Sequence, residues 1–225
     1  MINFRYCFIL SIAAGLLWSC AGSPEAPRED VQKHALHHLL VLPVTDMTVD
    51  RAPDTSIRSP LSGRMFNIGQ VDPLAGQEMT QTLIRQLHYR FPHLKITSAT
   101  VGLPARDERQ GFAANRRIFD AIRDMGRQAA ADYVMIGFIY DFRDRSGGGY
   151  GVETPAQIAF ELNLLQVDSG RLVWQKHFEE KQQPLTEDLF QFKKFWNRKG
   201  RWITALEMAS SAMKEMIGDL AKKYH

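Results

Sequence analysis

The sequence predicts an α+β fold, a single domain over residues 34–225 with a mixed sheet of about five strands and helices packed on it. Three observations predict it: a continuous apolar strand near the start, two helical patterns between the early strands, and a strand hairpin followed by a last helix. The predicted order is β-α-β-α-β-β-β-α, in which the crossing helices favour parallel strands and the hairpin antiparallel ones.

The first expected strand covers His37–Val44. Its main part, Leu39–Val44, is apolar without alternation, which is typical of a strand buried on both faces. Pro43 has no backbone donor and favours a strand end or an edge. The next stretch, 45–72, is polar and holds several prolines and glycines. We expect it to be a long loop that either binds something or is disordered.

The first helix is predicted to begin at Asp72-Pro73, with Asp72 as N-cap, and to stop before Pro92. A short, weakly alternating strand is expected over Leu94–Val101, followed by a loop over 102–114. The residues that share one face of this helix are Met79, Leu83, Ile84, Leu87 and Phe91.

A second helix is predicted from apolar residues at helical spacing: Ile118, Ile122, Met125 and Ala129. The stretch Tyr133–Phe142 is rich in β-branched and aromatic residues and predicts the third strand. Three consecutive glycines within 146–155 predict a mobile connection to the next strand.

The last two strands are predicted over Gln157–Val167 and Arg171–Glu179. We expect Asp168-Ser169-Gly170 to form the turn between them, because Asp can cap a turn and Gly can take a positive φ. An amphipathic helix over Ile203–Tyr224 is expected to end the domain. Its inward residues are expected to be Leu206, Met213, Met216, Ile217 and Leu220.

The first 19 residues have the layout of an export signal. Arg5 precedes an apolar stretch of 13 residues, Tyr6–Trp18, which is too short to span a bilayer comfortably. Leu17-Trp18-Ser19-Cys20 resembles the lipobox of bacterial lipoproteins, although Trp18 is larger than is usual there. The resemblance implies cleavage before Cys20 and attachment of diacylglycerol and a further acyl chain, such as palmitate. A signal cut elsewhere and an uncleaved anchor remain as alternatives.

The stretch 20–33 predicts a lipidated cysteine and a flexible tether, because small residues, two prolines and charges dominate it. By resemblance to lipoproteins of two-membrane bacteria, Ala21 after the cysteine favours the outer membrane over retention in the inner one. We therefore expect a protein held on the outer membrane and facing the periplasm, with the cell surface as an alternative side.

Composition excludes several classes of function. The formal net charge is only +3, which argues against nucleic acid as a partner. Cys7 lies in the signal and Cys20 would carry lipid, so the domain has no thiol for a disulfide or for cysteine chemistry. No cofactor motif is found, and we expect none to be bound.

Three passages resemble a group of bacterial envelope proteins. They are 129–137 (Ala-Ala-Ala-Asp-Tyr-Val-Met-Ile-Gly), the hairpin 164–174 and the opening strand Val41–Val44. The group includes the curli secretion lipoprotein CsgG, the synthase activator LpoB and the amino-terminal domain of TolB. The resemblance implies the α+β fold and an envelope role but no single task, because its members include a pore, an activator and a complex subunit.

Two sets of polar residues are candidate chemical sites. Among His34, His37 and His38, the first and last would share a face on a helix and could hold a metal, but a strand begins at about this point and no third ligand is nearby. Solvated histidines are therefore expected, and no metal. Asp141, Asp144 and Glu153 flank Gly147–Gly149 and could cleave glycosides if two carboxylates faced each other. The glycines follow no phosphate-loop pattern.

A segment after the last strand mixes aromatic and basic residues and is the candidate partner-binding surface, together with 45–72. Its residues are Phe190, Phe192, Lys193, Lys194, Phe195, Trp196, Arg198, Lys199, Arg201 and Trp202. The alternative is that the rings cover the sheet while the basic groups face water.

The sequence favours a non-enzymatic, lipid-anchored binding or accessory module in envelope assembly or export. The expected partners are the membrane, through acyl chains on Cys20, and an envelope protein or polymer. Homo-oligomer formation is left open. The second hypothesis is a lipid-anchored hydrolase of cell-wall polymers, and the third is an accessory subunit of a lipid or polysaccharide exporter.

Overall fold

The computed structural model describes residues 35–103, 111–146, 154–182 and 203–224. Its main sheet has the strand order β5-β1-β6-β7-β8. These strands are β1 (His38–Val41), β5 (Lys95–Ser98), β6 (Tyr133–Arg143), β7 (Gln157–Gln166) and β8 (Arg171–Lys181). The helices within the described ranges are α2 (Ala75–Arg90), α3 (Gly111–Gln128) and α5 (Ala205–Tyr224).

The sheet is mixed, as the sequence predicts. β1 pairs in parallel with both β5 and β6, so that Leu39 lies opposite Ile96 on one side and Tyr133 on the other. β6, β7 and β8 are antiparallel to their neighbours. The parallel pairs require crossovers, which α2 and α3 supply, whereas a short turn suffices between β7 and β8. The α+β class and single domain are confirmed.

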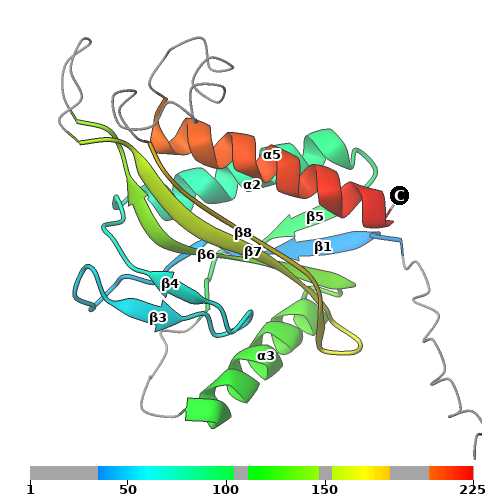
Figure 1. The fold of residues 1–225 in the computed structure, drawn as a ribbon. Helices are drawn as coiled ribbons and strands as arrows, with labels where there is room; N and C mark the ends of the chain where they lie inside the picture. The colour runs from blue at the N-terminus through cyan, green and yellow to red at the C-terminus, as the bar shows by residue number, and fades with distance from the viewer. Residues whose placement is uncertain (1–34, 104–110, 147–153, 183–202, 225) are drawn as a thin grey trace, which may run out of the picture. The chain divides into compact units, whose positions relative to one another are not determined.

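Helices cover both faces of the sheet (Figure 1). α2 and α5 lie side by side over one face, and α3 lies on the other, next to a two-stranded hairpin. Two apolar clusters result, one on each face of the sheet. All four residues of β1 are buried between the two layers, which confirms the strand buried on both faces. No helix in the described ranges is long and apolar enough to span a membrane.

The stretch 45–72 is not a long loop, so that expectation is wrong. It contains β2 (Thr45–Asp46), which pairs with β6, and an antiparallel hairpin of β3 (Ser56–Arg58) and β4 (Met65–Asn67). Five apolar side chains of the stretch are buried in the cluster on this face of the sheet: Met47, Ile57, Leu61, Phe66 and Ile68. The ring of Phe66 stacks on that of Tyr140 in β6, with centroids 3.8 Å apart.

The start of α2 also differs from the prediction. The N-cap residue is Leu74, which makes no side-chain cap, and the carbonyl of Asp72 accepts the N–H of Ala75. Thr80 fixes the helix to the chain after β1: its hydroxyl donates to the carbonyl of Gly76 (2.6 Å) and accepts the N–H of Val44 (2.9 Å). The predicted stop before Pro92 is confirmed, since α2 ends at Arg90.

The second half follows the prediction closely. β7 and β8 are joined by a turn in which Gly170 has a φ of 66°, as expected for the glycine of this turn. α5 begins with a capping box: Thr204 Oγ1 accepts the N–H of Glu207, and a Glu207 carboxylate oxygen accepts the N–H of Thr204. Of its predicted inward residues, Leu206 is half-buried and the others are buried.

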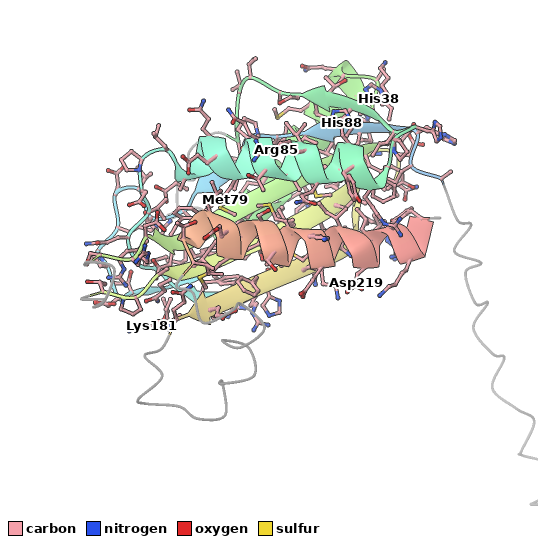
Figure 2. All side chains as sticks on the ribbon, turned by 90° about the horizontal axis from the view of Figure 1, so that it is seen from above. His38, Met79, Arg85, His88, Lys181 and Asp219 are labelled. Atoms are coloured by element: carbon pink, nitrogen blue, oxygen red, sulfur yellow. The ribbon has the colours of Figure 1, made fainter. Side chains whose placement is uncertain are left out.

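The domain has two ends along the strand direction. We call the end at which the described chain starts the proximal end, and the opposite end the distal end. At the proximal end the described chain starts at Ala35, the β7–β8 turn lies beside the start of β6, and α5 ends with Tyr224 against Tyr133. At the distal end Arg143, Gln157 and Lys181 are register partners. Figure 2 shows His38 and His88 toward one end and Lys181 at the other.

Candidate functional site

Several residues that the sequence singles out lie outside the described residues. They are Cys20, His34, Gly147–Gly149, Glu153 and the whole aromatic and basic segment 190–202. The structure does describe the residues on either side of the gap that contains this segment. Gln182 follows β8, and its side-chain amide donates to the carbonyl of Ile203, 3.0 Å away. Both flanking residues therefore lie at the distal end, where α5 begins.

Of the histidines near the start of the domain, the structure describes His37 and His38. His37 is exposed, as expected for a solvated histidine. His38 is not, and that expectation is wrong: it is buried at the start of β1. Its Nδ1 lies 2.8 Å from the carbonyl oxygen of Ala130, and its Nε2 lies 2.8 Å from the Thr97 hydroxyl. Because a carbonyl only accepts, Nδ1 carries the hydrogen, and the ring ties three segments together.

A polar pocket of about 350 Å³ opens at the distal end, between the 53–54 and 67–70 stretches and the ends of β6, β7 and β8. We call it the distal pocket. Its charged lining residues come from three parts of the chain: Asp54, Asp141, Arg143, Glu179 and Lys181. The remaining lining is small or neutral, so the pocket suits a polar molecule rather than an apolar one.

Asp141 is the most unusual residue of the distal pocket. Its side chain is only 2% exposed, and its Oδ1 has no hydrogen-bond partner in the described structure. Gly69 packs directly over it, because a Cβ built on Gly69 would lie 2.2 Å from the Asp141 Cγ. Burial raises the pKa of Asp141 to about 6; the neighbouring Asp54 and Glu179 add to the rise, and Arg143 and the Gln70 N–H oppose it.

Asp144, the second carboxylate of the predicted catalytic group, serves a structural purpose instead. It is exposed and does not line the distal pocket. Its Oδ1 accepts the backbone N–H of Ala205 at 2.6 Å, which satisfies one of the free donors at the start of α5. Asp141 and Asp144 thus share no cleft in the described structure. The carboxylates that do line the pocket with Asp141 are Asp54 and Glu179, which the sequence analysis missed.

The raised pKa of Asp141 makes a prediction about stability and pH. Because the folded state favours the neutral form, its contribution is fully present below about pH 4 and is lost as the pH rises through about 6. Asp141→Asn removes this dependence. Between pH 4 and pH 7, the free energy of unfolding of the wild type should fall by about 1–2 kcal/mol relative to that of the variant, once screening by solvent is allowed for. Urea unfolding at several pH values measures this; parallel pH profiles would contradict it.

A second buried carboxylate, Glu161 in β7, holds the β3–β4 hairpin on the sheet. Glu161 is 1% exposed and accepts hydrogen bonds from Ser59, from Ser62 at 2.6 Å and from the Tyr140 hydroxyl at 3.0 Å. Ser59 in turn accepts the backbone N–H groups of Leu61 and Ser62. Both carboxylate oxygens accept hydrogen bonds within the cluster, so its role is to dock the hairpin.

At the proximal end, exposed basic side chains follow the last turns of α2 and α5 and the start of β5: Arg90, Lys95, Lys222 and Lys223. Lys222 pairs with Asp219 at 2.8 Å, and Lys223 donates to the Val173 carbonyl. Tyr89 is 82% exposed beside them. Two exposed carboxylates, Asp132 and Asp168, lie at the same end on the α3 side. The α2 and α5 side of this end is therefore basic.

Comparisons with known proteins give no family for this chain: no family model matches it, and no curated protein matches it. Its fold does resemble solved structures. The PelC dodecamer from Paraburkholderia phytofirmans matches with a TM-score of 0.48 and 13% identity, over 82% of this chain and 88% of that one.

Two further matches are bacterial. Lipoprotein GNA1162 from Neisseria meningitidis gives a TM-score of 0.38 and 11% identity, over 73% of this chain and 98% of that one. The LpoB C-terminal domain from Escherichia coli gives 0.33 and 17%, over 66% and 84%. All three scores are below 0.5, so these likenesses carry no conclusion on function.

Proposed function

We propose that this protein is a non-enzymatic, lipid-anchored envelope protein that binds other envelope components close to the outer membrane, on its periplasmic side. The observation that carries the proposal is the lipobox-like sequence Leu17-Trp18-Ser19-Cys20 after an apolar stretch of signal length. One acyl chain alone binds a membrane only marginally, whereas the three chains of a processed lipoprotein would hold it there durably.

The shortness of the proposed tether supports this proposal. Residues 21–34 separate Cys20 from Ala35, the first described residue, and a flexible chain of that length reaches about 20 Å on average. The proximal end is thus kept near the membrane. Its basic side, with Arg90, Lys95 and the exposed Tyr89, suits a surface of phosphate headgroups. The distal end, with its pocket, is then free to meet partners.

The proposed partner-binding segment agrees with this orientation. Its flanking residues, Gln182 and Ile203, lie at the distal end, where β8 ends and α5 begins. We propose that the aromatic and basic residues of 190–202 contact an envelope protein or polymer there. Tethering raises the local concentration of such a contact, so that a weak interface is sufficient.

Lipidation is tested by Cys20→Ser. We expect the wild type, extracted from membranes, to lack residues 1–19 and to carry the mass of diacylglycerol plus one acyl chain. The variant should lose this mass and leave the outer-membrane fraction almost completely. Cys7→Ser is the matched control, because Cys7 lies within the proposed signal and should leave the lipid in place. A wild-type protein with a bare Cys20 would end the proposal.

Partner binding is tested by replacing Phe195, Trp196 and Trp202 together by Ser. Aromatic anchors supply much of the free energy of an interface, so we expect recovery of the cross-linked partner from intact cells to fall at least tenfold. Tyr89→Ser is the control, since this exposed aromatic residue lies at the proximal end. Equal recovery from both variants would show that the segment is not the binding surface.

A further inference from the structure

We propose that the turn between α2 and β5 docks on an anionic phospholipid membrane, with Tyr89 at the level of the headgroups and with Arg90 and Lys95 against their phosphates. We call residues 88–95 the docking turn. The inference rests on the proposed function, because the tether from Cys20 is what keeps this turn near a membrane. It adds the contact surface, the lipid chemistry and the orientation of the domain.

The docking turn lies where the described chain begins. The N–H of Lys95 donates to the carbonyl of His37 at 3.0 Å, and His37 is two residues after Ala35. His38 is the register partner of Lys95 in the pairing of β1 with β5. Figure 2 shows His88 toward the same end as His38. A short tether that enters the domain at Ala35 therefore brings the docking turn to the membrane rather than the distal end.

The backbone of the docking turn is fixed by hydrogen bonds and by two apolar side chains. The N–H of Phe91 donates to the Leu87 carbonyl at 2.8 Å, and the N–H of Leu94 donates to the Phe91 carbonyl at 3.1 Å. Leu94 is buried and Phe91 is half-buried in the apolar cluster that α2 and α5 form on the sheet. Because the turn is already ordered, docking costs little conformational entropy.

Tyr89 is the most unusual residue of the docking turn. It is 82% exposed, the highest value among the exposed large hydrophobic residues of the described chain. Two residues along a helix turn the side-chain direction by about 200°, so Tyr89 points away from the side on which Leu87 is buried. A tyrosine has an apolar ring and a polar hydroxyl, which suits the boundary between headgroups and acyl chains.

The charges of the docking turn favour an anionic surface. The sequence has no acidic residue between Glu78 and Asp107, a stretch that includes the whole turn. Arg90 and Lys95 are exposed, and neither forms an ion pair with any residue in the described ranges. The helix dipole explains a basic residue at the end of α2 but not one at the start of β5. The α3 side of the same end carries exposed carboxylates instead, so the domain should lie with its α2 side toward the lipid.

Two other ligands fit the docking turn less well. His37, His88 and His93 are exposed in or beside it, but no group of three or more His, Cys, Asp or Glu side chains in the described ranges is placed to hold a metal ion. A soluble anionic polymer has the matching charge. It provides no apolar layer for Tyr89, however, and the tether does not raise its concentration at the turn.

The test measures how fast a water-soluble acetylating reagent reacts with Lys95 in the protein purified from membranes, with mass spectrometry as the readout. The protein is reconstituted on vesicles of phosphatidylcholine, with or without phosphatidylglycerol. We expect Lys95 to react at least about threefold more slowly where phosphatidylglycerol is present. Lys181 at the distal end is the internal control and should react equally on both kinds of vesicle. At about 1 M salt the difference should disappear, while the acyl chains keep the protein on the vesicles.

Two substitutions that remove the same charge locate the contact. Arg90→Gln should lower the protection of Lys95, and Tyr89→Ser should lower it through loss of the ring. Arg127→Gln acts on the α3 side of the same end, where Arg127 pairs with Asp124 at 3.7 Å, and should leave the protection unchanged. All three replaced side chains are exposed, so the variants should fold, which circular dichroism checks.

Several results would overturn the proposal. Equal reaction of Lys95 on both kinds of vesicle is one, and equal losses of protection from Arg90→Gln and Arg127→Gln are another, since net charge alone would then be responsible. Stronger protection by soluble polyglutamate than by the anionic vesicles would assign the turn to a polymer instead. Lipidation is read separately, from the mass of the protein. If Cys20 were bare, the anchor would fail, but protection of Lys95 by added anionic vesicles would still support the docking turn as a lipid contact.

Discussion

Changing Glu161 to Ala should lower the free energy of unfolding by about 3–5 kcal/mol. The substitution removes the acceptor of three hydroxyl groups, those of Ser59, Ser62 and Tyr140, in a site that is 1% exposed. Each buried polar group left without a partner costs about 1–3 kcal/mol, and the cavity adds to this. Urea denaturation followed by circular dichroism measures the loss.

The effect should be centred on the β3–β4 hairpin. Hydrogen exchange at the amides of Ser59 and Ile68, which bond to Arg64 and Thr55 within the hairpin region, should speed up more than exchange in β7. Glu161→Gln keeps one acceptor oxygen and serves as the milder control, with a smaller loss. If the hairpin amides were unaffected by Glu161→Ala, the docking role of Glu161 would be disproved.

The same substitution, Gly to Ala, should have opposite effects in two helices. At Gly76 in α2 a Cβ would lie 2.8 Å from the backbone carbonyl oxygen of Val44. We expect Gly76→Ala to cost about 1–3 kcal/mol, as overpacking does. At Gly218 in α5 no atom lies within 4 Å of the built Cβ. Gly218→Ala should therefore stabilise by about 0.5–1 kcal/mol through helix propensity.

Thermal unfolding of the two variants beside the wild type measures both effects under identical conditions. The midpoint should fall for Gly76→Ala and rise for Gly218→Ala. Thr80→Val would add to the first result, because it removes the hydroxyl that joins Gly76 and Val44. An unchanged or higher midpoint for Gly76→Ala would mean that α2 does not approach the chain after β1 as closely as described, and a lower midpoint for Gly218→Ala would contradict the open space around Gly218.

Continuous apolar runs made most of the fold predictable. The short β1 and the long β6 and β7 consist almost entirely of buried residues, and their apolar runs are visible in the sequence. Gly170 likewise marks the turn between β7 and β8. The stretch 45–72 gives no such signal. Its strands are two or three residues long, and only one residue in each of β3 and β4 is buried. Burial there comes from packing on β6, which no local pattern encodes.

Some residues of the candidate sites can also be predicted from the sequence, and others cannot. Asp141 was selected from the sequence, but its neighbours in the pocket, Asp54 and Glu179, come from elements far apart in the chain. Glu161 offered a usable signal, because it is the single charged residue of a mostly apolar strand and lies between Phe160 and Leu162. His38 offered none, because its burial depends on Thr97 and Ala130 arriving from other elements.

The place of β1 in the sheet has a mechanical consequence. The strand that continues from Ala35 is not at an edge but lies between β5 and β6, paired in parallel with both. A pull between the membrane and a partner at the distal end would act along β1, across its hydrogen bonds on both sides. Those bonds would have to break together rather than one after another, so the domain should resist stretching in the direction in which an anchored protein is pulled.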